Sequence, residues 1–343
     1  MKILEKVSLA QYSTMGLGGN AAYVTEVRTP PEVAEALRWA QEKGVPALMI
    51  GGGSNVVWSD DGFDGLVLVD LIPGYEALAE DDEGVTLKIG SGEVWDTVVE
   101  RTVSANLTGI ESLSLVPGST GATPIQNVGA YGQEIANTLV EVEAFDSKAG
   151  DFVKIPAAEC GFSYRDSRFK TGPDRGRFFI TAITLRLRKG DPKPPFYRTL
   201  QAYLDEHHIT DFTPAVIRKA VIAIRTSKLP DPAVIKNTGS FFANPIVDEE
   251  RFLDIQDKSP DIPNWVAANG GIKLSAAWLI AQAGFTDFHD SETGMATWPK
   301  QPLVLVNEKA TSTGDLLRFK QKIVDAVQAK FGVTLVQEPE LLP

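Results

Sequence analysis

The sequence contains little histidine and almost no cysteine. Its 343 residues include three histidines and a single cysteine, Cys160. One cysteine excludes an internal disulfide and is typical of a reducing compartment. His207, His208 and His289 form no cluster with cysteine at the spacing of metal ligands. The sequence therefore predicts neither a structural disulfide nor a bound metal.

An excess of positive charge and a long apolar run are also absent. There are 33 Lys and Arg residues against 45 Asp and Glu, a net charge of −12, which disfavours binding to nucleic acid or an anionic membrane. No apolar run approaches the roughly 18 residues of a membrane-spanning helix. The N-terminal residues do not resemble a signal peptide. We expect a cytoplasmic protein whose phosphate sites are built locally, from backbone amides and a few basic side chains.

Two common nucleotide motifs are missing as well. The turn Gly51-Gly-Gly-Ser-Asn55 follows an apolar strand, but Val56 occupies the position of the last glycine of a dinucleotide-binding motif. No Gly-x-x-x-x-Gly-Lys-Ser/Thr sequence is present, so a P-loop is excluded. A third motif, the Gly-x-Ser-x-Gly of serine hydrolases, is also absent, which disfavours that class of enzyme. A glycine-rich turn after a strand still exposes backbone amides. The turn therefore remains a candidate anion cradle.

The segment from Pro117 to Gly132 is rich in glycine and carries no charged residue. Linkers are normally polar and charged, and core strands exclude this much glycine and proline. Glycine permits positive φ angles and the close approach of a ligand. The segment also offers short neutral polar groups, on Ser119, Thr120, Thr123, Gln126 and Asn127. It is either an ordered loop that caps a sheet or the wall of a ligand site.

Apolar periodicity and capping residues predict alternating helices and short strands. The expected helices cover residues 29–44, 93–105, 214–229, 275–284 and 313–331. The expected strands cover residues 45–50, 66–70, 85–89, 139–145, 178–187 and 302–307. On the last helix we expect a core-facing stripe of Leu316, Lys320, Ile323, Val327 and Phe331. The segment 189–195 reads as a linker, with a domain boundary there or within the helix pair that follows it.

Three polar segments contain residues that could carry chemistry. They are Tyr164-Arg-Asp-Ser167, Arg225-Thr-Ser-Lys228 and Gly239-Ser240. A serine hydroxyl is a weak acid, so Ser240 could donate a proton only to a very basic group such as an enolate. The charge of that enolate would need an arginine or an acid to hold it. Taken singly, each segment is also compatible with an ordinary structural role.

Together these segments resemble one family, the flavin-dependent UDP-N-acetylenolpyruvoylglucosamine reductases of bacterial cell-wall synthesis. The matching segments occur in the family's order over nearly the whole chain. Tyr197 and Trp265 make the chain similar to the longer subclass, in which an aromatic-bearing loop covers the substrate. The matching segments are Gly51–Asn55, Pro117–Gly132, Cys160–Ser167, Arg225–Pro232 and Gly239–Pro245.

The resemblance implies an α+β fold of three parts. A two-subdomain FAD-binding fold of the PCMH/vanillyl-alcohol-oxidase type would cover residues 1–210, with subdomains of about 1–65 and 66–210. A C-terminal α/β substrate-binding domain would cover residues 211–343, and its last segment would return to the active site. The resemblance also implies a bacterial, cytoplasmic enzyme, which we expect to be a monomer.

The resemblance further implies a reaction and a set of catalytic residues. Non-covalent FAD would carry hydride from the co-substrate NADPH to C3 of the enolpyruvyl group of the UDP-sugar substrate. Ser240 would then protonate C2 of the enolate. Arg165 and Glu338 would hold the substrate carboxylate and spread the enolate charge, with Tyr164 beside them.

The cofactor and substrate contacts are assigned by position. For the substrate and the NADPH phosphates, the candidates are Arg225, Lys228, Asn244, Tyr197 and Trp265. The expected FAD contacts are Gly51, Gly52, Gly53, Ser54, Asn55, Pro117, Gly118, Thr120, Gly121, Ala122, Thr123, Gln126, Asn127, Gly129, Ala130 and Tyr131.

Two departures from the family pattern and two other functions remain open. Near the C-terminus this chain has Leu335-Val-Gln-Glu338, so ungapped counting selects Glu338 as the acid and a two-residue slip selects Glu340. Trp265 stands where a tyrosine is frequent. Another flavin enzyme on this scaffold, acting on a hydroxy acid or sugar, would need a base over the flavin. A non-catalytic flavin or nucleotide-sugar binding protein would lack one of the catalytic residues.

Overall fold

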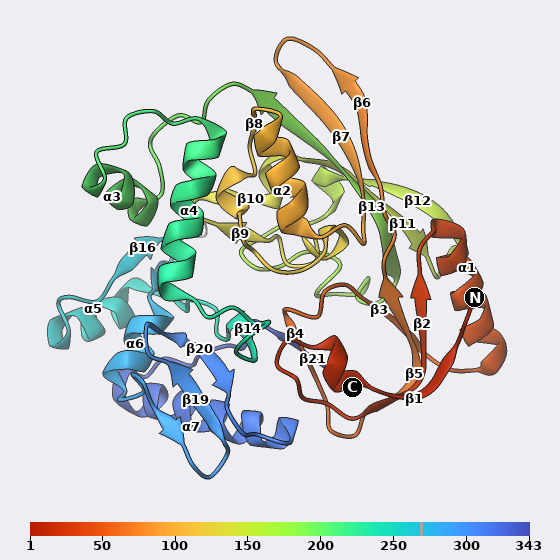
Figure 1. Cartoon of the computed structure of the whole chain (residues 1–343). Coiled ribbons are helices and arrows are strands. Elements are labelled where there is room, and N and C mark those ends of the chain that lie inside the picture. The colour runs from red at the N-terminus through yellow and green to blue at the C-terminus, as the bar shows by residue number, and fades with distance from the viewer. Residues whose placement is uncertain (268–269) are drawn as a thin grey trace. The chain divides into compact units, whose positions relative to one another are not determined.

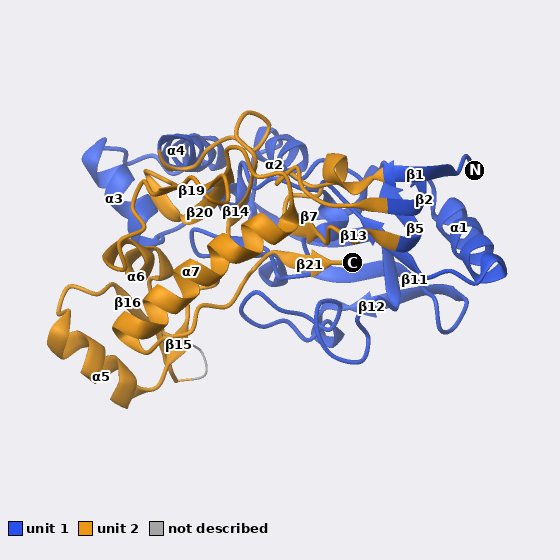
Figure 2. Ribbon diagram, turned by 90° about the horizontal axis from the view of Figure 1, so that it is seen from below, with its two compact units in different colours: residues 1–7, 21–52, 64–227 blue, residues 8–20, 53–63, 228–343 orange. Residues whose placement is uncertain are grey.

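The computed structural model describes residues 1–267 and 270–343, and it mixes helices with mainly antiparallel sheets (Figure 1). The chain divides into two compact units, each discontinuous in sequence (Figure 2). Unit 1 comprises residues 1–7, 21–52 and 64–227. Unit 2 comprises residues 8–20, 53–63 and 228–343.

The largest sheet of unit 1 is antiparallel and has a helix against it. Its strand order is β12-β11-β13-β7-β6, and the short β8 also pairs with β13. Helix α2 (Trp95–Ser104) buries Trp95, Val98 and Val99 in the same core as Leu87, Val142 and Ile183 of the sheet. The strands are β6 (Tyr75–Glu80), β7 (Gly84–Gly90), β8 (Leu107–Thr108), β11 (Leu139–Asp146), β12 (Asp151–Pro156) and β13 (Phe178–Lys189).

A smaller sheet has the order β1-β2-β5-β3 and belongs to unit 1, apart from a few end residues. Helix α1 (Pro30–Lys43) begins at Thr29, whose side chain accepts from the Glu32 amide, and ends at Gly44 in the left-handed conformation. Its buried residues Val33, Ala36 and Ala40 share a core with Leu66 and Leu68. The strands are β1 (Leu4–Ser8), β2 (Asn20–Val27), β3 (Ala47–Ile50) and β5 (Phe63–Asp70).

Unit 1 is completed by two helices and a hairpin. Helices α3 (Arg198–Glu206) and α4 (Pro214–Lys228) share a small core that includes Leu200, Leu204 and Ile217, and Tyr131 packs against it. The hairpin consists of β9 (Gly129–Ala130) and β10 (Gln133–Glu134). Short 3-10 turns are η1 (Leu9–Tyr12), which lies in unit 2, and η2 (Glu111–Leu113), η3 (Thr120–Ala122), η4 (Ile135–Asn137) and η5 (Ala157–Glu159) of unit 1.

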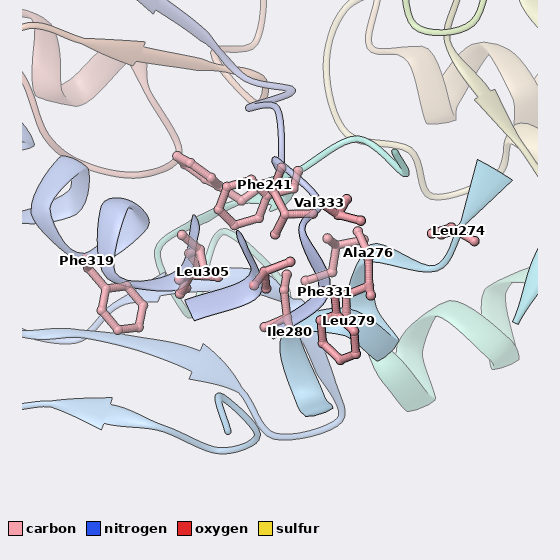
Figure 3. Close-up of a cluster of buried hydrophobic side chains, with 14 of the residues drawn as sticks. Phe241, Leu274, Ala276, Leu279, Ile280, Leu305, Phe319, Phe331 and Val333 are labelled. Atoms are coloured by element: carbon pink, nitrogen blue, oxygen red, sulfur yellow. The ribbon is translucent and has the colours of Figure 1, made fainter. Parts of the chain in front are cut away.

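Unit 2 is built around the long helix α7 (Thr313–Phe331). Its sheet order is β14-β20-β19-β18, beside a three-stranded sheet β15-β17-β16 and a parallel pair β21-β4. Phe241, Leu305, Phe319 and Val333 belong to its core (Figure 3). The other elements are β4 (Val56–Trp58), β14 (Asn237–Ser240), β15 (Ile246–Val247), α5 (Glu249–Lys258), β16 (Asn264–Val266), β17 (Ile272–Leu274), α6 (Ala276–Gln282), β18 (His289–Asp290), β19 (Met295–Trp298), β20 (Gln301–Asn307) and β21 (Glu340–Leu342).

The expected stripe of α7 is wrong at one position. Leu316, Ile323, Val327 and Phe331 are buried as predicted, but Phe319 takes the place assigned to Lys320. Residues three and four apart share a helix face, so both positions border the stripe and the apolar ring is the one that is buried. Lys320 is only partly buried, and its ammonium group donates to Gln337 Oε1 at 3.2 Å.

Asp70, at the end of β5, is a buried acid with a shifted pKa. Its side chain is 5% exposed, and its Oδ1 accepts from the Ile72 amide at 3.1 Å. Burial raises its pKa from 3.8 to about 6. The folded state therefore holds this proton more tightly than the unfolded chain, and the contribution of Asp70 to stability falls as the pH rises from about 4 to about 6.

Replacing Asp70 by asparagine is expected to remove this pH dependence, because the amide oxygen still accepts from Ile72 and no charge is buried. At pH 7.5 the variant should be more stable than the parent by up to about 3 kcal/mol, and near pH 3.5 the two should be similar. Urea unfolding at both pH values measures the difference. A variant less stable than the parent at pH 7.5 would contradict the assignment.

Candidate active site

Gly51 and Gly52 lie against the glycine-rich segment within unit 1. A side chain at Gly51 would overlap the Ser119 hydroxyl, and one at Gly52 would place Cβ 3.0 Å from the Gly118 Cα atom. Both positions therefore require glycine, so that two stretches of main chain can approach each other closely. Gly53 belongs to unit 2, where its φ is +66° and a Cβ would overlap the Tyr12 carbonyl oxygen.

The Ser119 hydroxyl is buried and makes no hydrogen bond to the part of the chain that the structure describes. Its neighbours are already engaged, because the Thr120 amide donates to Glu93 O at 2.9 Å and the Gly121 amide to Ser91 O at 2.8 Å. A buried hydroxyl without a partner costs free energy. This one lies in a glycine cradle, so its chemistry fits a polar ligand group such as a phosphate oxygen.

Several predicted cofactor residues of this segment have structural partners, among them Thr123 and Asn127. Asn127 donates from Nδ2 to Glu134 Oε2 at 2.8 Å and accepts at Oδ1 from the Ala136 amide at 3.2 Å. The Thr123 hydroxyl donates to Thr120 O at 2.7 Å. Asn127 and Tyr131 also have positive φ angles, both 47°. These side-chain bonds therefore hold the loop in its shape.

Arg165 is held against the β9–β10 hairpin. Its Nη2 donates to the Gly129 carbonyl at 2.8 Å, and its guanidinium lies 5.2 Å from the centre of the Tyr164 ring. The φ of Arg165 is +57°, a strained conformation for a non-glycine residue that is enriched at functional sites. The structure therefore brings the predicted pair Tyr164 and Arg165 together with the glycine-rich segment.

Tyr131, Tyr197 and Arg225 also meet within unit 1. The two tyrosine rings pack edge to face with centroids 6.2 Å apart. Burial raises the pKa of Tyr131, and the positive charge of the Arg225 guanidinium opposes that rise. Desolvation lowers the pKa of Arg225, and its buried Nε has no hydrogen-bond partner among the described residues. A desolvated guanidinium nitrogen of this kind is suited to an anionic ligand.

In unit 2, the C-terminal segment pairs with the chain directly after Ser240. Phe242 and Gln337 form an antiparallel bridge, and the Glu338 amide donates to the Phe241 carbonyl at 2.9 Å. Phe241 is fully buried, which fixes the end of β14 (Figure 3). Glu340 instead lies in β21, opposite Val56, and its amide donates to Asn55 O at 2.9 Å. The main chain of Glu338, rather than that of Glu340, is therefore the one hydrogen-bonded beside Ser240.

Three further predicted residues of unit 2 differ in their surroundings. Asn244 accepts at Oδ1 from the Ala276 amide at 2.9 Å, which satisfies a backbone donor at the start of α6. Trp265 is half-buried on β16, opposite Lys273. Lys228 is exposed at the end of α4, and its carbonyl accepts from the Trp298 indole at 3.0 Å.

Across residues 1–267 and 270–343, no helix is long and apolar enough to cross a membrane, and no His, Cys, Asp and Glu groups gather to hold a metal ion.

Unit 1 also contains a cavity of about 550 Å³, and none of the predicted site residues lines it. It is lined by Thr108, Gly109, Gln133, Asn137, Thr138, Leu139, Val140, Arg186 and Arg188.

Ser119 is not among the cofactor contacts predicted from the sequence. It is, however, one of the polar residues of the glycine-rich segment. The sequence offers a signal for it, since Ser119 lies between the two glycines at 118 and 121. What the sequence could not provide is the burial of the hydroxyl and its lack of a partner within the described chain.

Two family models match this chain. Residues 21–155 match the model of an FAD-binding domain, and residues 231–342 match that of the UDP-N-acetylenolpyruvoylglucosamine reductase C-terminal domain. The reductase of that name from Cupriavidus pinatubonensis is 40% identical over 334 residues, which is 97% of each chain. The one from Pseudomonas aeruginosa is 36% identical over 341 residues, or 99% of each chain.

The fold of this chain is similar to that of a solved structure. The crystal structure of UDP-N-acetylenolpyruvylglucosamine reductase from Thermus caldophilus has a TM-score of 0.68 and 24% identity, and the match covers all of both chains. The expected α+β class, a FAD-binding fold followed by a C-terminal domain of this family, is confirmed. With relatives this similar along its whole length, the chain belongs to the UDP-N-acetylenolpyruvoylglucosamine reductase family.

Proposed function

We propose that this chain is a cytoplasmic, monomeric enzyme that uses NADPH and FAD to reduce the enolpyruvyl group of UDP-N-acetylglucosamine enolpyruvate, forming UDP-N-acetylmuramate for peptidoglycan synthesis. Family membership and the matched FAD-binding domain support this function. Residues 1–210 would hold FAD, with subdomains of about 1–65 and 66–210, and residues 211–343 would bind the substrate.

Non-covalent FAD is supported by the glycine cradle of unit 1. Gly51, Gly52 and Gly118 allow close main-chain approach, and Ser119 supplies an unpaired buried hydroxyl within the described chain. When bound, FAD supplies the hydride chemistry that connects NADPH to C3 of the enolpyruvyl group. The assigned cofactor residues hold its phosphates and line its ring with uncharged main chain.

Replacing Ser119 by alanine tests this cradle. The apoprotein should be as stable as the parent or more so, because the hydroxyl has no described partner to lose. Affinity for FAD should fall about 10- to 100-fold, the usual effect of deleting a hydrogen bond to a charged group. Fluorescence titration of the apoprotein with FAD measures the change, and unchanged affinity would exclude Ser119 from the cofactor site.

Four residues serve the carbon chemistry. Ser240 donates a proton to C2 after hydride has reached C3, so the net addition of two hydrogens yields the lactyl ether. Arg165 and the acid Glu338 bind the substrate carboxylate and spread the negative charge that develops on it. Tyr164, beside the Arg165 guanidinium, restricts the orientation of that group.

One observation supports the assignment of Ser240 as the proton donor and of Glu338 as the acid that acts with it. The segment ending at Glu338 is hydrogen-bonded to the residue that follows Ser240, although the two lie about a hundred positions apart in the sequence. This supports Glu338 over Glu340 as the acid.

The UDP-sugar and NADPH are assigned to the remaining residues. Arg225 is suited to bind a phosphate, because its buried Nε has no hydrogen-bond partner among the described residues. Lys228 is exposed and is suited to the same role. The Asn244 Nδ2 group can donate while Oδ1 accepts from a backbone amide of α6. Tyr197 and Trp265 offer aromatic surfaces to the sugar nucleotide.

Product analysis tests the function. Protein incubated with NADPH and UDP-N-acetylglucosamine enolpyruvate is expected to yield a product two hydrogens heavier, with deuterium at C2 when the reaction runs in D₂O. Mass spectrometry and proton NMR identify it. Oxidation of a hydroxy acid or sugar, with no change in the enolpyruvyl compound, would overturn the proposal.

A further inference from the structure

Glu111, in η2, is a buried carboxylate that the assigned chemistry does not use. It is 2% exposed, and no ion pair to it is formed within residues 1–267 and 270–343. Three donors satisfy its oxygens: the Thr108 hydroxyl at 2.9 Å, the Gly109 amide at 2.6 Å and Gln133 Nε2 at 2.8 Å. Because burying a carboxylate is costly unless it is well hydrogen-bonded, this arrangement requires all three donors to stay in place.

Gln133 joins this carboxylate to the β9–β10 hairpin. The Gln133 amide is held at both ends, since its Oε1 also accepts from the Ser112 amide at 2.8 Å. Gln133 lies opposite Ala130, and Glu134 lies opposite Gly129. The turn between the strands is Tyr131-Gly132, the end of the segment assigned to the flavin ring. One side chain therefore ties the hairpin to η2.

The other strand of the hairpin carries the Arg165 contact. The Gly129 carbonyl accepts from Arg165 Nη2 at 2.8 Å, and a Cβ at Gly129 would lie 3.1 Å from Arg165 Nη1. A displacement of β10 would move β9, because the two strands are paired. It would then move the acceptor that orients the guanidinium.

We propose that Glu111 is a positioning residue, which acts through Gln133 to fix the β9–β10 hairpin and thereby the orientation of Arg165. The catalytic part of this inference rests on the proposed function. Misplacement of a charge-stabilising group by about 1 Å can slow a reaction about 100-fold, so a clamp on the hairpin has a measurable kinetic effect.

The E111Q variant tests the clamp, because it places an amide group where three donors converge. Amides of residues 128–134 are expected to exchange with solvent at least tenfold faster in the holoprotein. Reduction of the enolpyruvyl substrate should slow about 10- to 100-fold, while flavin bleaching by NADPH stays within about threefold of the parent. Hydrogen exchange with mass spectrometry and anaerobic stopped-flow absorbance measure the two effects.

A reversed pair distinguishes the clamp from general loss of stability. The double variant E111Q/Q133E restores one amide and one carboxylate, with Ser112 and Gly109 still able to donate, and it should recover most of the exchange protection and of the rate. The control E143Q removes the Glu143 carboxylate from its ion pairs with Lys88 and Lys154 in the same unit and should change neither readout. Should E111Q fail to fold, Gln133→Met cuts the same link and should reproduce its two effects.

The proposal is overturned if E111Q keeps the parent's exchange rates and substrate reduction, or if the reversed pair fares no better than E111Q. A parent protein that does not reduce the enolpyruvyl substrate would instead refute the proposed function. In that case the exchange of residues 128–134 still decides whether Glu111 holds the hairpin.

Discussion

Replacing Ser240 by alanine is expected to slow substrate reduction about 10²- to 10⁴-fold, the usual contribution of a general acid. Flavin bleaching by NADPH should remain as fast as in the parent, because no proton reaches C2 in that half-reaction. Ser240 ends β14 opposite Val304, and its fully buried neighbour Phe241 anchors the strand, so the loss of one hydroxyl should leave the fold intact. Anaerobic stopped-flow absorbance separates the two half-reactions.

Thr238 provides the matched control. Thr238 lies two residues earlier on β14, and its buried hydroxyl makes no hydrogen bond to the described part of the chain. Thr238→Val should therefore leave both half-reactions close to the parent's. An equal fall in both half-reactions for Ser240→Ala, or a comparable loss for Thr238→Val, would remove Ser240 from the role of proton donor.

Glu338→Gln is expected to reduce the rate of substrate reduction by about 10²- to 10³-fold, whereas Glu340→Gln should have little effect. Loss of one group that stabilises developing charge commonly costs this much. The two acids are two residues apart, but only the Glu338 amide is bonded to Phe241 beside Ser240, while Glu340 pairs with β4. Measuring kcat/KM for both variants with the enolpyruvyl substrate compares them directly.

The reverse pattern would show that the acid is Glu340. It would place the catalytic carboxylate on β21, and the pairing between residues 241–243 and 336–338 would then have only a structural role. The stability of the two variants, measured by urea unfolding, controls for loss of that pairing.

Local patterns in the sequence account for much of the fold. Thr29 and Gly44 bound α1, and Ser312 and Gly332 bound α7, because capping residues and left-handed glycines are readable in sequence. The misplaced Lys320 shows the limit of periodicity. Whether a residue at the border of a helical stripe is buried depends on its neighbours in space. For Lys320 such a neighbour is Gln337, and helical periodicity does not predict that contact.

The site residues were predicted from motifs, and what motifs omit is the set of contacts that hold them. The pairing of Glu338 with Phe241, the left-handed φ of Arg165 and the bond from Gln133 to Glu111 all join segments distant in sequence or depend on burial. No single-sequence pattern encodes these contacts. The ungapped count that selected Glu338 and the backbone pairing beside Ser240 are independent arguments for the same residue.

The central claim is that this chain passes reducing equivalents from NADPH through FAD to an enolpyruvyl sugar nucleotide. An anaerobic visible absorption spectrum of the purified protein tests it most directly, before and after NADPH and again after UDP-N-acetylglucosamine enolpyruvate. We expect a flavin spectrum that bleaches with NADPH and returns when the enolpyruvyl compound is added. Bleaching without return would contradict the substrate, and a colourless protein that FAD cannot reconstitute would contradict the whole assignment.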